Sequence, residues 1–305
     1  MEYFSIGGLP VLWDSEGGLP LPPGGYIEGF RTTREALPAG PGVLFRSRYG
    51  DTMALAAAAE PVSEKLYTSL YHAPRGRMLV HHLGRYRAGM ITYPDEFQPG
   101  ENGWVTVECI CHPGFASPGD PGTVVEAATV LGRAGLHMAL QPFGTAVLHG
   151  SFIKWEGGAI LFSAPSGVGK STQAALWQKY AGATVVNGDR VLLRELDGRY
   201  YACGYPACGS SDVCLNEMLP IRAIVLLEQA GENEVTALSA GEKIRRLLTG
   251  MELYRWHEGE LDRALRFCEG LVDALPVPLL RCRPDEGAVR ALQSYLSCGG
   301  NENAD

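Results

Sequence analysis

The sequence predicts an α/β domain with a mixed sheet, preceded by a smaller and mainly β domain. Two observations lead to this division of the 305 residues. The first part of the chain is rich in Gly and Pro and holds short alternating stretches, which are typical of strands separated by turns. The second part combines apolar runs with amphipathic segments, which indicates strands and helices together. We therefore expect an N-terminal domain over residues 1–122 and an α/β domain over residues 123–305.

The first domain is expected to hold short strands between irregular loops. Alternating apolar and polar residues predict strands over residues 42–46, 79–82, 88–93 and 104–110. The segment Ser117–Gly122 contains two Pro-Gly pairs, which are typical of turns, and is the predicted linker.

The second domain is expected to begin with a helix over residues 123–140 and to continue as strands joined by hairpins. Glu156-Gly157-Gly158 and Asp197-Gly198 are the predicted hairpin turns. A Ser cap and an apolar stripe predict a helix over residues 239–248, and a similar stripe predicts one over residues 285–296. Strands are predicted over residues 146–155, 159–163, 183–186, 191–193, 200–202 and 221–227.

Composition and charge exclude several classes of protein. The net charge of -8 argues against a general nucleic-acid binder, because such proteins present a basic face. No apolar run is long enough to span a bilayer, and Met1–Ser5 lacks the basic start of a signal peptide. We therefore expect a cytoplasmic protein with no nucleic-acid or membrane partner. The number of subunits is left open, and a homo-oligomer is allowed.

The 8 cysteines are interpreted as reduced and largely buried. Cys109-Ile110-Cys111-His112 resembles a fragment of a metal site, and Cys203, Cys208 and Cys214 form a second group. Neither group has paired CxxC spacing, and cysteine is a common small core residue. We therefore expect neither group to bind metal.

The segment between the predicted strand 159–163 and a following helix carries a phosphate-binding loop. Gly167 and Gly169 allow backbone N–H groups to surround an anion, Lys170 supplies a cation for the β- and γ-phosphates, and Ser171 supplies a hydroxyl for Mg²⁺. Ala164 stands where the strict motif has Gly, at a position that leaves the strand. The predicted nucleotide-binding residues are Ala164, Pro165, Ser166, Gly167, Val168, Gly169, Lys170, Ser171 and Thr172.

An acidic residue follows the next predicted strand. We expect Asp189 to lie at the same sheet edge as the loop. A carboxylate at this place would hold Mg²⁺ or accept the proton of an acceptor hydroxyl. The alternative is a turn residue in Asn-Gly-Asp. His149 precedes the loop by one hairpin, and by itself a lone His is weak evidence for a catalytic role. Ser210 and Ser211 are interpreted either as turn residues or as lining for an acceptor.

Together these segments resemble the catalytic domain of HPr kinase/phosphorylase, which is related to phosphoenolpyruvate carboxykinase. The resemblance covers roughly residues 145–295 and rests on Leu148-His149-Gly150-Ser151, the phosphate loop, and Val185-Val186-Asn187-Gly188-Asp189-Arg190. It implies an HPr-kinase-like P-loop kinase fold. It also implies that Lys170 and His149 act at the transferred phosphate and that Asp189 is the general base.

The chain departs from this family at Gly188, where the family has a first Asp. The sequence offers Asn187 and Glu217 as two alternatives for that acid and does not decide whether either takes its place. The segment used for phosphorylase activity is not recognisable, so we expect a kinase without efficient phosphorylase activity. Three later segments, residues 204–211, 216–223 and 281–289, resemble HPr-kinase-related proteins, some of which act in peptide natural-product pathways.

The resemblance implies an ATP-dependent kinase that uses ATP and Mg²⁺. The expected acceptor is a hydroxyl group of a peptide or small protein, most simply a serine. The alternative is a nucleotide-binding regulatory protein with little or no transfer activity, and Gly188 is the feature that favours it.

Overall fold

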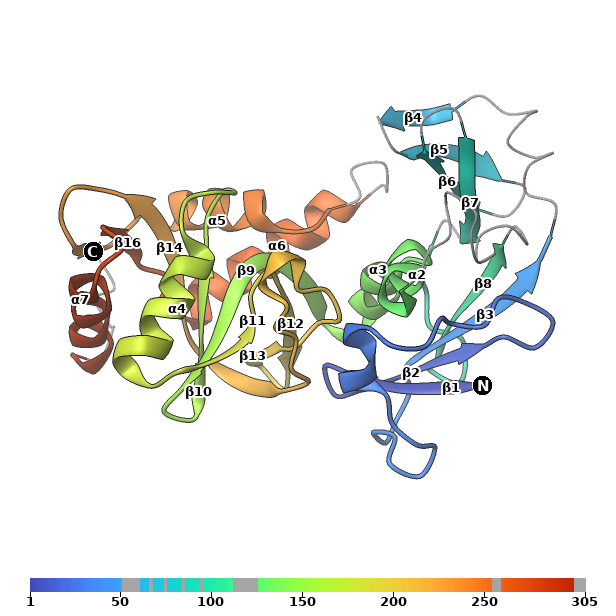
Figure 1. Ribbon diagram of the computed structural model, residues 1–305, viewed down its shortest axis with the longest axis horizontal. Helices are drawn as coiled ribbons and strands as arrows, with labels where there is room; N and C mark the ends of the chain where they lie inside the picture. Colours follow the sequence, from blue (N-terminus) through green and yellow to red (C-terminus); the bar gives the residue numbers. More distant parts are fainter. Residues whose placement is uncertain are drawn as a thin grey trace. The chain divides into compact units, whose positions relative to one another are not determined.

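The structure is a computed structural model that describes residues 1–50, 61–65, 68–73, 76–83, 86–93, 96–111, 126–253 and 259–298. The chain divides into two compact units, Met1–Phe143 and Gly144–Asp305 (Figure 1). This division falls later than the expected boundary at residue 122, because the helical segment that ends at Phe143 belongs to the first unit. The predicted linker Ser117–Gly122 lies outside the described residues.

The first unit is built on a sheet of order β1-β2-β3-β8-β7-β6-β5-β4. The pairs β2–β3 and β3–β8 are parallel, and the other pairs are antiparallel. Buried and exposed residues alternate strictly along β8, as expected for a strand with one face in a core. The strands are β1 (Glu2–Ile6), β2 (Leu9–Asp14), β3 (Val43–Tyr49), β4 (Pro61–Lys65), β5 (Thr68–Ala73), β6 (Gly76–Leu83), β7 (Tyr86–Tyr93) and β8 (Val105–Cys111), with a short 3₁₀ helix at η1 (Tyr26–Phe30).

The single helix expected over residues 123–140 is wrong within the described residues. The segment forms two short helices, α2 (Ala127–Arg133) and α3 (Leu136–Leu140), followed by the 3₁₀ turn η3 (Gln141–Phe143). Gly135 separates the helices with φ 89°, a left-handed conformation that ends a right-handed helix. The apolar stripe read from the sequence therefore belongs to two elements.

The second unit is a mixed α/β structure, as predicted. Strands β10, β14 and β16 are parallel neighbours, whereas β9, β12 and β13 pair antiparallel. Its strands are β9 (Thr145–Trp155), β10 (Gly158–Ser163), β11 (Thr184–Asn187), β12 (Arg190–Leu196), β13 (Arg199–Cys203), β14 (Met218–Gln229), β15 (Glu234–Thr236) and β16 (Leu279–Cys282). Its helices are α4 (Lys170–Ala181), η4 (Gly209–Ser211), α5 (Ala240–Gly250), α6 (Glu260–Ala274) and α7 (Glu286–Ser297).

Helices cover both faces of β10, which is buried along its whole length. Leu161 belongs to a core cluster with residues of α5 and α6, whereas the next residue, Phe162, belongs to a cluster with residues of α4 and α7. Successive side chains of a strand point to opposite faces, so these two clusters lie on opposite sides of the sheet. The second unit is therefore a three-layer arrangement, and Figure 1 shows α5 and α6 packed together.

The predicted hairpin turns are confirmed. Glu156 and Gly157 both have positive φ (46° and 77°), as do Asp197 and Gly198 (52° and 72°). Two consecutive residues with positive φ match the twist of the strands that the turn connects. The predicted cap of α5 is also confirmed, because the Ser239 side chain accepts a hydrogen bond from the backbone N–H of Glu242.

Strand β9 changes partners in its middle, and this change positions the candidate site. On one edge of β9, His149 pairs with Arg190 at the start of β12. On the other edge, Gly150 pairs with Ser163 at the end of β10. The end of β10 and the start of β12 therefore lie on either side of β9, at its adjacent residues His149 and Gly150.

Among the described residues, no helix is long and apolar enough to cross a membrane.

Candidate functional site

The phosphate loop connects the end of β10 to the start of α4, as the sequence predicts. Gly167 has φ 80° and Gly169 has φ 124°, both in the region that disfavours residues with a Cβ. A Cβ at Gly167 would meet no atom within 4 Å, so the backbone conformation and not the available space requires glycine there. The Gln229 side chain donates to the carbonyls of Gly167 (3.4 Å) and Val168 (3.3 Å), which fixes the orientation of these peptide planes.

The start of α4 presents groups suited to an anion. No side chain among the described residues caps the helix at Gly169, and the first-turn residues Ser171 and Thr172 are exposed. Uncapped N–H groups and the helix dipole favour negative charge at this end. The Ser171 hydroxyl is thus accessible at the start of the helix.

Lys170 lies folded over its own loop. Its Nζ donates to the carbonyls of Ala164 (2.9 Å) and Pro165 (3.4 Å), and the residue is buried. Burial lowers the pKa of Lys170, and the charge of Asp189 opposes this shift. The loop cation and the predicted acid therefore interact electrostatically.

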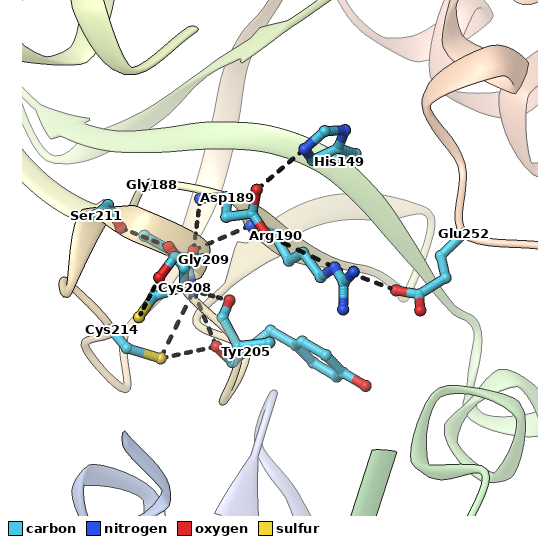
Figure 2. Close-up of polar contacts among 12 residues, drawn as sticks. His149, Gly188, Asp189, Arg190, Tyr205, Cys208, Gly209, Ser211, Cys214 and Glu252 are labelled. Atoms are coloured by element: carbon cyan, nitrogen blue, oxygen red, sulfur yellow. Dashed lines mark hydrogen bonds and ion pairs between the residues drawn. The ribbon is translucent and has the colours of Figure 1, made fainter. Parts of the chain in front are cut away.

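Asp189 lies in the short interruption between β11 and β12. His149 Nε2 is 3.0 Å from Asp189 Oδ1, and an ionised Asp189 accepts this bond from Nε2–H (Figure 2). The Gly150 N–H donates to the Asp189 carbonyl, and Ser151 Oγ donates to the Gly188 carbonyl (2.9 and 3.1 Å). Side-chain and backbone contacts to β9 thus hold Asp189 beside the end of β10.

Asn187 shapes this turn and is not available to a metal ion. Its Oδ1 accepts from the N–H groups of Asp189 and Arg190, both at 3.0 Å, and its Nδ2 donates to the carbonyl of Tyr205 at 2.8 Å. Both acceptor positions of the amide oxygen are therefore occupied. The contacts of its amide therefore argue against Asn187 as a substitute for the missing Asp.

Glu217, the other alternative, pairs with a lysine of β9. Its carboxylate accepts a 2.8 Å hydrogen bond from Lys154, which pairs with Ala159 at the hairpin end of β9. Five residues separate Lys154 from His149, which is about 17 Å along an extended strand.

Gly188 is required by the packing of the following loop. A Cβ at residue 188 would overlap Cβ and Oγ of Ser211, whose hydroxyl donates to the Cys208 carbonyl at 2.7 Å. Gly209 packs in turn against Asp189, since a Cβ there would lie 2.8 Å from Asp189 Cγ (Figure 2). The Ser211 side chain thus occupies the space that a side chain at residue 188 would need, and its hydroxyl group bonds within its own loop. The side chain of Ser210 lies outside the described part of the chain.

We expect Gly188→Asp to destabilise the protein by about 1–3 kcal/mol, because the new side chain overpacks against Ser211. Chemical unfolding of the variant measures this loss. The double variant Gly188→Asp/Ser211→Gly should recover most of it. Equal stability of the single variant and the wild type would show that the loop carrying Ser211 moves freely.

Arg190 and Glu252 extend the site, and the role of Glu252 was not predicted. Arg190 Nε lies 3.8 Å from Asp189 Oδ2 and 3.5 Å from Glu252 Oε2, and Figure 2 shows Arg190 between the two carboxylates. The Glu252 N–H donates to the Val147 carbonyl, which attaches the segment after α5 to β9. No motif marks Glu252 in the sequence, because only this tertiary contact brings it to the site.

The contribution of Glu252 to the stability of the folded state should decrease as pH rises. Burial raises its pKa, with the nearby Asp189 adding to the effect and Arg190 and His149 opposing it. The folded state therefore binds a proton more tightly than the unfolded state above pH 4.5, so this contribution is present at low pH and lost as pH rises through the raised pKa. We expect the melting temperature of Glu252→Gln, relative to wild type, to increase over this range. A difference that is independent of pH would contradict the assignment.

A cavity of about 550 Å³ lies beside the start of the loop. The loop contributes Ala164–Ser166, β9 contributes His149, and α5 contributes Arg245, Arg246, Thr249 and Gly250. His149, which is bonded to Asp189, therefore borders this cavity. The contribution of α5 was not predicted from the sequence.

Five cysteines are buried in the described part of the chain, whereas Cys214 and Cys282 are half-buried and Cys298 is exposed. Burial raises the pKa of Cys203 and of Cys214 to about 12 and that of Cys111 to about 11. No group of three or more His, Cys, Asp or Glu side chains among the described residues is arranged to hold a metal ion. His112 lies outside the described residues.

Comparison with solved structures gives weak similarities of fold. The structure of the Hpr(Ser) kinase/phosphatase from Coxiella burnetii is similar with a TM-score of 0.30 and 11% sequence identity, over 50% of this chain and 93% of that chain. No protein-family model matches the sequence. No curated protein matches it either.

Proposed function

We propose that this chain is an ATP-dependent kinase that transfers the γ-phosphoryl group to a hydroxyl group, most simply a serine of a peptide or small protein. The observation that carries the proposal is the position of two elements on either side of β9, at its adjacent residues His149 and Gly150. The loop with Lys170 leaves the end of β10, and the Asp189 carboxylate, bonded to His149 at 3.0 Å, lies beside it. The resemblance of these motifs to HPr kinase/phosphorylase supports the same reaction class.

The residues fit the roles that phosphoryl transfer requires. The loop N–H groups and Lys170 hold the phosphates, and Asp189 accepts the proton of the acceptor hydroxyl. The acceptor oxygen then bonds to the γ-phosphorus while the bond to the β-phosphate oxygen breaks, and ADP leaves. His149 keeps the Asp189 carboxylate oriented and, when protonated, adds positive charge near the transferred group.

The donor set also fits a magnesium ion that arrives with the nucleotide. Mg²⁺ in such sites keeps several waters and takes one or two protein groups besides the phosphates, so a full protein cage is not needed. The exposed Ser171 hydroxyl is the first candidate ligand, and Asp189 through a water is the second. Such an ion neutralises charge on the phosphates during transfer.

A nucleotide-binding regulator is the second candidate. The packing of Ser211 against Gly188 favours it, because no second carboxylate stands beside Asp189 at that position. The two candidates differ in one measurable property. A regulator binds ATP but labels no acceptor, whereas a kinase does both.

The test combines equilibrium binding of Mg²⁺–ATP with transfer to a pool of serine-containing peptides. Nucleotide binding together with phosphorylated peptides supports the kinase. Nucleotide binding with no labelled peptide or protein acceptor supports the regulator. Absence of nucleotide binding contradicts both candidates.

A further inference from the structure

The cavity beside the phosphate loop has a basic lining in an acidic protein. Among the described residues that line it, the titratable side chains are His149, Arg245 and Arg246, and none is a carboxylate. The chain as a whole carries a formal net charge of -8. A concave site with one sign of charge attracts ligands of the opposite sign, so this cavity favours anions.

Two different elements supply this lining. The loop residues Ala164–Ser166 form the side that continues to Lys170 and the start of α4. Arg245 and Arg246 are consecutive residues of α5, and Thr249 lies one helical turn after them. Because the loop already supplies a cation and N–H donors for the nucleotide phosphates, the α5 side is available to a second anionic group.

Carboxylates of the same region hold the two arginines in place. Arg245 donates to Glu242 from Nε and Nη2 (2.9 and 2.7 Å). Arg246 donates to Glu242 (2.7 Å) and to Glu228 (3.3 Å). These contacts use two of the five N–H donors of each guanidinium, so each retains donors for an oxyanion. Arg245 is exposed, where ion pairs are weak and a ligand oxyanion can compete with Glu242. Arg246 is half-buried and offers its unused donors.

We infer that Arg245 and Arg246 bind an oxyanion that the acceptor carries close to its reacting hydroxyl. The acceptor class is a peptide in which the serine has a neighbouring carboxylate or phosphate group. Guanidinium groups suit both, because their planar donors match two oxygens at once. This inference rests on the proposed function and adds to it a substrate class.

Binding of short fluorescent peptides tests the inference without requiring transfer. Four peptides differ only in the residues beside one serine, which are glutamate, phosphoserine, glutamine or lysine. Fluorescence anisotropy gives their dissociation constants for the full chain, with and without Mg²⁺ and a non-hydrolysable ATP analogue. We expect the glutamate or the phosphoserine peptide to bind about tenfold more tightly than the glutamine peptide, and the lysine peptide to bind most weakly. The first two peptides distinguish a carboxylate from a phosphate.

Three variants separate the arginines from general charge effects. Arg245→Gln/Arg246→Gln should abolish the preference, and Gln keeps the helix propensity of α5. Glu242→Gln should strengthen binding of the acidic peptides, because it releases both arginines from their shared partner. Arg290→Gln is the matched control, since Arg290 pairs with Glu286 one turn away on α7 and does not line the cavity.

Acidic peptides that bind wild type no better than the glutamine peptide would overturn the inference. So would a double variant that keeps the preference and instead loses affinity for the ATP analogue, because the arginines would then belong to the nucleotide site. Either result leaves the proposed kinase function standing, since nucleotide binding and transfer are measured separately. A chain that prefers acidic peptides but binds no nucleotide contradicts the proposed function instead.

Discussion

Lys170→Ala should weaken binding of Mg²⁺–ATP by about 100-fold or more. The Lys170 ammonium lies at the start of α4 and can move from the carbonyls of Ala164 and Pro165 to the phosphates of a nucleotide. Losing one partner of a desolvated, hydrogen-bonded charge pair costs about 2–5 kcal/mol, and 1.4 kcal/mol is a tenfold change in affinity. Isothermal titration of wild type and variant measures the difference directly.

Lys179→Ala is the matched control, because Lys179 lies on the same helix and its ammonium contacts the Tyr180 ring. This variant should bind nucleotide as wild type does. Far-UV circular dichroism and thermal unfolding establish that Lys170→Ala remains folded. Unchanged nucleotide affinity in a folded Lys170→Ala protein would show that the loop is not the phosphate site.

Asp189→Asn should lower the rate of phosphoryl transfer by about a thousandfold, within the range that a general base contributes. The substitution keeps the size of the side chain, and the amide oxygen still accepts from His149. It also removes a negative charge close to Lys170, so nucleotide phosphates should bind at least as tightly as before. Initial rates at saturating nucleotide, together with nucleotide affinity, separate these two effects.

Asp197→Asn controls for the loss of a carboxylate. Asp197 is exposed in the turn between β12 and β13 with φ 52°, a conformation that Asn also adopts. The rate of phosphoryl transfer by Asp197→Asn should equal that of the wild type. Full activity of Asp189→Asn would show that another group accepts the proton.

Local signals in the sequence predict most of the elements around the site. The strand, loop and helix around Lys170 follow from an apolar run, two glycines and a helical segment, and the hairpin turns follow from Glu-Gly and Asp-Gly pairs. The start of α5 follows from Ser239. Each of these signals acts within a few residues of the chain, which is why one sequence is sufficient.

Features that depend on tertiary contacts could not be predicted from the sequence. Helix α6 has Gly259 at its start in place of a capping side chain, and β1 and β2 precede any recognisable motif. Asn187 has the chemistry of a metal ligand, but backbone groups that follow it in the chain occupy its amide. Glu252 and the arginines of α5 reach the site because the segment after α5 pairs with β9.

Label transfer from ATP tests the central claim most directly. The full chain is incubated with Mg²⁺, serine-containing peptides flanked by acidic residues, and ATP labelled on either the γ- or the α-phosphate. The account predicts that the γ-label appears on serine, that the α-label does not, and that Asp189→Asn slows the transfer by about a thousandfold. Nucleotide bound without labelled peptide, or α-label on the peptide, would contradict the account.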